Sequence, residues 1–210
     1  MAGAVMNELF QIRPFARLCA VALMLGVAAC GQPSATGAGA EPPLAGASIG
    51  GPFSLIDQDG KAVTDRDFAG KFRLMYFGYS FCPDVCPVDL QKLMAGYRLL
   101  EQRAPELAAR IQPVFVTVDP ARDTPAVLKS YVAAFHPRLI GLTGTEAEIA
   151  DVTRRYAIVF RRDDAKGTTD YLVDHSRQTY LFGPKGDPIA LIPQDGTPEA
   201  IADELQRWAK

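Results

Sequence analysis

Histidine and cysteine are scarce in this 210-residue chain, which has two histidines, four cysteines and one tryptophan. Its lysines and arginines form no basic run, and the formal net charge is −2. Nucleic-acid binders carry a basic patch or stripe, so we expect no nucleic-acid partner. Hydrophobic residues make up 48% of the chain and charged residues 22%, which is ordinary for a domain that buries a core.

The first thirty residues differ in composition from the rest. Arg13 and Arg17 precede an uncharged apolar run over residues 18–29, a pattern typical of a signal peptide. The run is too short for a permanent membrane-spanning helix, which needs about 20 residues. Its end, VAACG, resembles a bacterial lipobox in which Cys30 is lipidated and becomes the first residue of the mature protein. An ordinary cleavable signal is the alternative.

Three regions follow from this composition. We predict a lipoprotein-type signal peptide over residues 1–29, a lipidated Cys30 with a flexible Gly/Ala/Pro tether over residues 30–50, and a folded domain over residues 51–210. The protein is then a periplasmic lipoprotein on the extracytoplasmic face of a bacterial membrane, held there by its lipid anchor. We expect a monomer. Since Cys19 leaves with the signal, the folded domain retains only Cys82 and Cys86.

Strands and helices alternate along the folded domain. Largely apolar runs over residues 73–77 and 114–119 predict buried strands, and further strands are expected over residues 139–142, 156–160, 179–182 and 189–192. Thr124, Thr145 and Thr197 each precede an amphipathic helix. A hairpin over residues 53–63 is expected to cover one end of the sheet. The pattern predicts an α/β fold with a central mixed sheet flanked by helices and an N-terminal β-hairpin.

Cys82 and Cys86 stand where an apolar strand gives way to a helix, in the sequence YFGYSFCPDVCP. A reactive pair at this place is the arrangement of a thioredoxin-like domain. The positive end of the helix lowers thiol pKa values, which favours nucleophilic attack and metal binding. A structural disulfide is the plain alternative, but closing so short a loop contributes roughly 2 kcal/mol. A domain of about 160 residues buries enough surface to fold without it.

His175 is the candidate third member of the site. It lies just ahead of the strand at residues 179–182, and in a thioredoxin-like fold the loop before that strand lies against the cysteine loop. Two sulfurs and one imidazole suit Cu(I), and imidazole also suits Cu(II). Zinc remains possible but needs a fourth ligand, for which Asp84 is the nearby candidate. His136, beside Pro137 at a helix end, is expected to be structural, with its charge favoured by the helix dipole.

Three segments together are similar to the Sco/SenC family of copper-binding proteins: YFGYSFCPDVCP at 76–87, VTVDPARDTPAVLKSYVAAFHPRLIGLTG at 116–144 and YLVDHSRQTYLFGPKG at 171–186. The resemblance runs over residues 53–208. It implies a thioredoxin-like fold, copper bound by Cys82, Cys86 and His175, and delivery to the dinuclear copper site of cytochrome c oxidase subunit II. Many family members use a transmembrane helix where this chain has a predicted lipid anchor.

Two functions stay open at this point. The first is a membrane-anchored copper metallochaperone that passes its ion to a periplasmic acceptor. The second is a thiol-disulfide oxidoreductase in which Cys82 attacks and Cys86 resolves, a role that the resemblance also implies. A peroxiredoxin is disfavoured because Tyr79 stands where such enzymes place a threonine.

Overall fold

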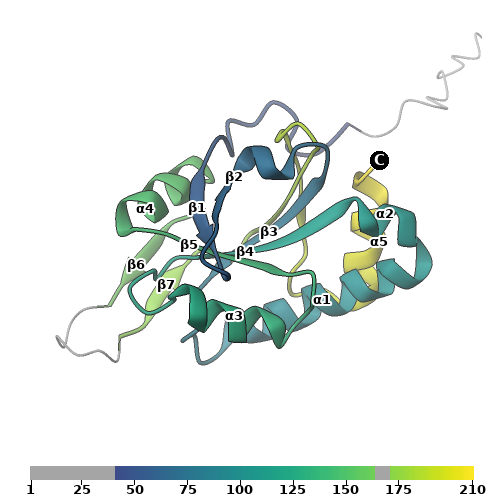
Figure 1. The fold of residues 1–210 in the computed structure, drawn as a ribbon. Coiled ribbons are helices and arrows are strands. Elements are labelled where there is room, and N and C mark those ends of the chain that lie inside the picture. The colour runs from purple at the N-terminus through teal and green to yellow at the C-terminus, as the bar shows by residue number, and fades with distance from the viewer. Residues whose placement is uncertain (1–40, 164–170) are drawn as a thin grey trace, which may run out of the picture. The chain divides into compact units, whose positions relative to one another are not determined.

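A seven-stranded mixed sheet forms the centre of the protein, in the strand order β2-β1-β5-β4-β3-β8-β9 (Figure 1). The computed structural model describes residues 41–163 and 171–210. The predicted signal peptide, the lipidation site Cys30 and the first part of the tether lie outside the described residues. The strands are β1 Ser54–Asp57, β2 Ala62–Thr64, β3 Phe72–Gly78, β4 Ile111–Thr117, β5 Ile140–Thr143, β6 Phe160–Arg162, β7 Val173–His175, β8 Thr179–Phe182 and β9 Pro188–Ile192.

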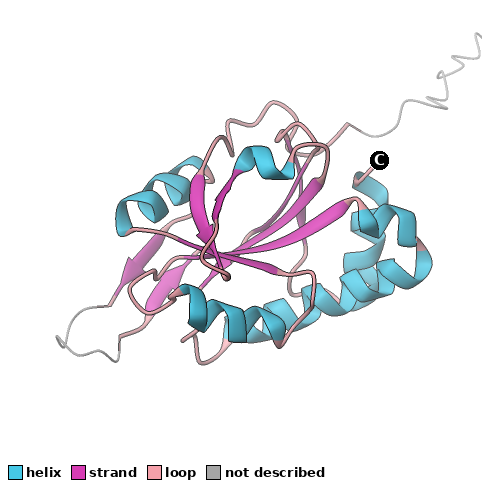
Figure 2. Ribbon diagram, viewed as in Figure 1, coloured by secondary structure: helices cyan, strands magenta, loops and turns pink. Residues whose placement is uncertain are grey.

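Helices cover both faces of the sheet (Figure 2). They are the 3-10 helix η1 Asp65–Phe68 and the α-helices α1 Val85–Arg103, α2 Pro105–Ala109, α3 Pro125–Ala133, α4 Glu146–Arg155 and α5 Pro198–Trp208. The chain passes from β3 through α1 to β4 and through α3 to β5, and right-handed crossovers place α1 and α3 on one face. Helix α5 packs on α1, and α4 lies on the opposite face.

The centre of the sheet is parallel and its β8–β9 side is antiparallel. Strand β3 pairs in parallel with β4, from Phe72 opposite Ile111 to Gly78 opposite Thr117. Every residue of both strands is buried. Strand β8 runs antiparallel to β3, and β9 antiparallel to β8. The mixed α/β architecture with late antiparallel strands is confirmed, and the carboxyl ends of β3 and β4 open toward the start of α1.

The helix starts follow the predicted capping chemistry. The side chains of Thr124, Thr145 and Thr197 accept hydrogen bonds from backbone N–H groups in the first turns of α3, α4 and α5. These bonds satisfy donors that a helix leaves unpaired at its first turn. Helix α2 was not among the predicted elements, because a single turn carries too little periodicity to be recognised.

One prediction about the sheet is wrong. Residues 156–160 do not form a strand: Tyr156 ends α4 with its ring buried, and Ala157 turns the chain at a φ of 53° before β6. The N-terminal hairpin forms at one end of the sheet, as predicted. Its strand β1 pairs antiparallel with β5 and so extends the sheet. Backbone donors on the edge strand β5 need partners, and β1 supplies them.

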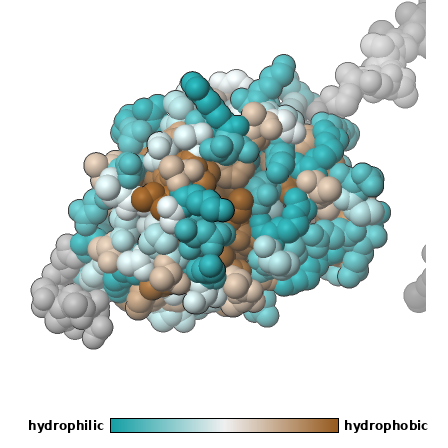
Figure 3. All heavy atoms as spheres, in the orientation of Figure 1, coloured by the Kyte–Doolittle hydropathy of each residue, from teal (hydrophilic) through white to brown (hydrophobic). Residues whose placement is uncertain are grey.

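The surface seen in Figure 3 is mainly hydrophilic, as expected when the apolar side chains fill the core.

Residues 41–50 contact the domain, since the Leu44 N–H bonds to the Ile189 carbonyl and the Gly50 N–H to the Arg155 carbonyl. No helix in residues 41–163 and 171–210 is long and apolar enough to cross a membrane.

Candidate metal centre

Cys82 lies just before α1 and Cys86 lies in its first turn, directly beyond the buried strand β3. Cys86 is the second residue of the helix and is buried, whereas Cys82 lies in the preceding turn and is half-buried. Both are free thiols, and the backbone N–H of Cys86 donates to the Cys82 sulfur at 3.5 Å. The predicted pair therefore has one accessible and one enclosed sulfur.

His175 reaches this pair from a small second sheet that the sequence did not reveal. Strands β6 and β7 pair antiparallel, with Phe160 opposite His175. The rings of Tyr76 and Tyr79 meet the imidazole edge-on, at centroid distances of 6.4 and 5.9 Å. His175 Nε2 lies 3.1 Å from Cys86 Sγ, across 89 residues of sequence. The fold thus brings together all three residues that the sequence nominated.

The tautomer of His175 follows from its other nitrogen. Nδ1 lies 2.9 Å from the carbonyl oxygen of Ser176, and a carbonyl only accepts, so Nδ1 carries the proton and donates it. Nε2 then keeps its lone pair directed at Cys86 when the ring is neutral. A ring nitrogen held in this way by a backbone carbonyl is the usual support of a metal-binding histidine.

The two thiols differ in acidity. Hydrogen bonding from the Cys86 thiol, together with that from the N–H groups of Cys86 and Asp84, lowers the pKa of Cys82 well below the ordinary thiol range. The pKa of the Cys86 thiol is raised, first by its hydrogen bond to the Cys82 sulfur and then by its burial. Cys82 is therefore the thiolate of the pair near neutral pH, and Cys86 holds the proton.

A buried carboxylate joins the cysteine helix to the histidine loop. Asp89 lies on α1, three residues after Cys86, and is only 1% exposed. Arg177, two residues after His175, donates to both of its oxygens, from Nη2 at 2.6 Å and from Nε at 3.0 Å. The Tyr76 hydroxyl donates to the same carboxylate at 2.9 Å. This arrangement of Asp89, Arg177 and Tyr76, here called the latch, fixes the separation of Cys86 and His175.

A second buried carboxylate holds the other side of the cysteine loop. Asp123 is fully buried and accepts the backbone N–H of Ser80 at 3.0 Å and the Thr117 hydroxyl at 2.6 Å. The Ser80 hydroxyl also donates to it. Burial raises the pKa of Asp123, while these donors oppose the shift. The loop that carries Cys82 is thereby tied to the end of β4.

Sequence reasoning did not select Asp89, Arg177 or Asp123. One signal was present for the latch: Asp89 interrupts the apolar face of α1 beside Leu90, and Arg177 stands just before the apolar strand β8. A charged residue inside a buried stretch requires a partner, but the sequence does not say which one.

The donor set fits a soft ion after a small adjustment. Among the described residues, no group of three or more His, Cys, Asp and Glu side chains is already spaced to hold an ion. In this state Cys86 Sγ and His175 Nε2 are at hydrogen-bond distance. With bonds of about 2.3 Å to sulfur and 2.0 Å to nitrogen, an ion would hold the two atoms roughly 3.5 Å apart. A small side-chain rotation provides that space.

Two other predicted residues contribute no side chain to this centre. Asp84 is exposed and is the N-cap residue of α1, without a side-chain capping bond. His136 is structural, as predicted, but its expected charge is not supported. It is buried against the Tyr97 ring, 3.2 Å from Glu101, and burial lowers its pKa. The desolvation cost of a buried imidazolium outweighs the attraction of Glu101.

Comparisons with known proteins identify the family of this chain. The SCO1/SenC family model matches residues 41–210. Protein SenC of Rhodobacter capsulatus is 46% identical over 162 residues, covering 77% of this chain and 71% of its own length. The chain spans about half the length of several other curated relatives that it matches.

Solved structures show the same fold. The structure of Bradyrhizobium japonicum ScoI with copper bound is 41% identical, with a TM-score of 0.69, covering 76% of this chain and 99% of that one. The thioredoxin domain of a thiol-disulfide oxidoreductase from Bacteroides vulgatus is 16% identical with a TM-score of 0.53, covers 76% of this chain and 94% of its own, and shows the fold alone. The fold is thioredoxin-like, and the chain belongs to the SCO1/SenC family.

Proposed function

We propose that this protein is a membrane-anchored, extracytoplasmic copper chaperone. Cys82, Cys86 and His175 bind the ion, and the protein delivers it to the dinuclear copper site of cytochrome c oxidase subunit II. The lipid on Cys30 would hold the domain at the membrane, as the sequence over residues 18–31 indicates.

The observation that carries the proposal is the approach of His175 to the cysteine pair. Its Nε2 lies 3.1 Å from Cys86 Sγ, and its Nδ1 is committed to a backbone carbonyl. A histidine that only filled the core would not need a free ring nitrogen directed at a thiol. One thiolate, one thiol that loses its proton when it binds the ion and one imidazole with a free ring nitrogen form the soft donor set that Cu(I) prefers.

Copper is favoured over zinc by the number of available ligands. A structural zinc ion takes four ligands, and the exposed Asp84 side chain is not directed at the pair by any hydrogen bond in the described part of the chain. The copper-bound ScoI structure, of similar sequence and fold, supports the same cargo. Cys82 is half-buried and stands beside the exposed Phe81, so an acceptor can reach the ion and exchange ligands with it.

Anaerobic Cu(I) titration of the reduced protein tests this proposal. Cys82→Ala, Cys86→Ala and His175→Ala should each weaken copper binding by orders of magnitude, because each removes one of three ligands. The matched control is His136→Gln, which changes the other histidine and should bind copper like the parent. Full copper affinity in the His175 variant would refute the three-ligand site.

A thiol-disulfide oxidoreductase is the second candidate, and the unequal thiols favour it. The Cys82 thiolate would attack an acceptor disulfide, forming a mixed disulfide and releasing one acceptor thiolate. Cys86, after losing its proton, would then attack Cys82 Sγ and release the second thiolate. The acceptor gains two electrons and the Cys82–Cys86 pair becomes a disulfide.

The requirement for His175 distinguishes the two functions. Disulfide reduction needs both cysteines, and His175→Ala should slow it at most, whereas the same variant should lose high-affinity copper. Reduction measured with a model disulfide such as glutathione disulfide, in parallel with copper titration, therefore assigns the role of each residue. Both activities in the parent protein would indicate a combined role, since the pair must be reduced before it binds copper.

A further inference from the structure

Arg73 is a buried cation at the end of the sheet opposite the cysteines. It is the second residue of β3 and is only 3% exposed. Its guanidinium carbon lies 5.3 Å from the centre of the Phe182 ring. Its Nη1 atom is buried and has no hydrogen-bond partner among the described residues. Buried arginines are normally paired, so this one requires an explanation.

The groups around Arg73 do not neutralise its charge. The buried Tyr156 hydroxyl accepts a hydrogen bond from the Arg73 side chain and donates its own proton to the Gly51 carbonyl. Asp65 is nearby but accepts a hydrogen bond from the Phe53 N–H and forms no ion pair with Arg73 within the described residues. An aromatic face and a neutral hydroxyl offset only part of the cost of burying a guanidinium.

A cavity of about 330 Å³ opens onto this guanidinium. It lies between η1 and the turn that joins β8 to β9, two segments tied together by the Gly70 N–H and the Pro184 carbonyl. Arg66 and Lys185 line it and are exposed. Gly186, at a φ of 89°, leaves the space open, because a Cβ there would come within 2.9 Å of Arg73 Nη2. The lining therefore contains three cations and one carboxylate.

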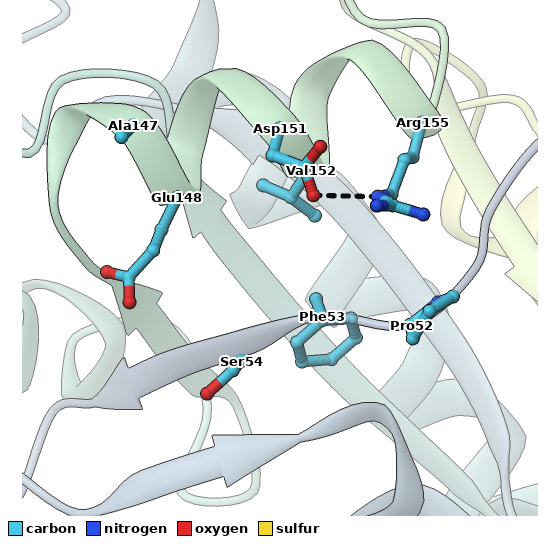
Figure 4. A pocket seen from close by; sticks show the side chains of 8 residues that line it. All are labelled: Pro52, Phe53, Ser54, Ala147, Glu148, Asp151, Val152 and Arg155. Carbon is cyan, nitrogen blue, oxygen red and sulfur yellow. Dashed lines mark hydrogen bonds and ion pairs between the residues drawn. The ribbon is translucent and has the colours of Figure 1, made fainter.

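The groove between residues 52–54 and α4 provides a contrast (Figure 4). There Arg155 points at Asp151 and bonds to it at 2.7 Å, and Glu148 closes the capping box of Thr145. The charges of that groove are satisfied within the protein. In the Arg73 cavity, by contrast, Arg73 Nη1 has no hydrogen-bond partner within the described residues.

We propose that the Arg73 cavity is an oxyanion-binding site for a phosphate group. Arg73 would donate to the phosphate oxygens from the floor of the cavity, and Arg66 and Lys185 would add positive charge at its rim. A planar guanidinium with unused donors matches such an anion in geometry and charge. A volume near 300 Å³ suits a small ligand.

Two sources could supply the phosphate, a free ion or a phospholipid headgroup. The segment at residues 41–50 joins the domain beside this cavity, because the Leu44 N–H bonds to Ile189 at the start of β9. If the chain upstream is anchored by lipid, this end of the domain is the one nearest the anchor in sequence, and headgroups are available to it.

Calorimetric titration of the purified full chain tests the site, with inorganic phosphate in one arm and glycerol phosphate in the other, at matched ionic strength. Arg73→Gln should weaken binding at least about tenfold, because charge-assisted hydrogen bonds are lost. The double variant Arg66→Gln/Lys185→Gln should weaken it about two- to fivefold, since exposed charges are screened. The control Arg155→Gln removes one paired positive charge and should change binding by less than about twofold.

Tighter binding of glycerol phosphate would assign the ligand to phospholipid headgroups, and tighter binding of inorganic phosphate to the free ion. Absence of binding by the parent protein, or equal loss in the Arg155 and Arg73 variants, would overturn the proposal. If Arg73→Gln fails to fold, the rim variant decides: parental affinity in that variant also overturns it.

Discussion

The latch between Asp89 and Arg177 offers the sharpest test of how the site is held together. Arg177→Gln removes both hydrogen bonds from the guanidinium and leaves the Asp89 carboxylate buried with Tyr76 alone. Hydrogen bonds to charged groups contribute about 1.5–3 kcal/mol each. Because the Arg177 side chain is 40% exposed, we discount the pair for solvent screening and expect a loss of about 2–3 kcal/mol in the free energy of unfolding.

The same change should loosen His175. Arg177 is two positions after His175 in the chain, a reach of at most about 7 Å, so the latch restricts the histidine directly. Ordering one residue costs about 1–2 kcal/mol in conformational entropy. If residues 176 and 177 become mobile, copper binding must reorder them at a cost of about 2 kcal/mol. Since 1.4 kcal/mol corresponds to tenfold, we expect Cu(I) affinity to fall roughly 30-fold.

Urea denaturation and competition with a chromophoric Cu(I) chelator measure the two effects. The matched control is Arg161→Gln on the neighbouring strand β6, which breaks the exposed pair with Asp174, whose side chains are 80% and 75% exposed. Such a surface pair contributes at most about 1 kcal/mol, so both readouts should stay close to parental values.

A double-mutant cycle with Asp89→Asn completes the test of the latch. The two residues share one network, so the cycle should give a coupling free energy of about 1–3 kcal/mol. Additive effects, or a copper affinity in the Arg177 variant within twofold of the parent, would refute the claim that this ion pair positions the histidine.

Three further predictions concern the remaining contacts. Iodoacetamide should alkylate Cys82 at a rate that is nearly constant between about pH 6 and 8, because its lowered pKa leaves it ionised throughout, while Cys86 stays unmodified. Asp123→Asn should destabilise the protein by about 1–3 kcal/mol in urea, because the donors from Ser80 and Thr117 lose their carboxylate. Gly96→Ala should cost about 1–3 kcal/mol or more in thermal unfolding, because its Cβ would meet Ile201 at 2.5 Å.

Each of these three predictions has a result that would contradict it. An alkylation rate that rises tenfold for each pH unit would mean that Cys82 has an ordinary thiol pKa. Parental stability of the Asp123 variant would mean that this carboxylate is not the anchor of the cysteine loop. An unchanged Tm for the Gly96 variant would mean that α1 and α5 can separate without cost.

The sequence alone predicted what depends on neighbouring residues. Apolar runs marked the central strands, and Thr124, Thr145 and Thr197 marked helix starts, because capping and periodicity act within a few positions. The cysteines were found at a strand-to-helix junction that is itself local. His175 was nominated by scarcity, since only two histidines exist, and by the resemblance of its segment to a known family.

The tertiary structure decided what depends on pairing across long separations. The β6–β7 strands that present His175, the attachment of β1 to β5 and the approach of Arg177 to Asp89 across 88 residues leave no local pattern. Burial determined the charge state and the unmet hydrogen bonds of polar side chains, because a histidine or arginine has other properties in the core than in water. Burial lowers the pKa of His136, and it leaves Arg73 Nη1 without a hydrogen-bond partner among the described residues. Desolvation depends on every surrounding atom, and only the folded chain supplies those atoms.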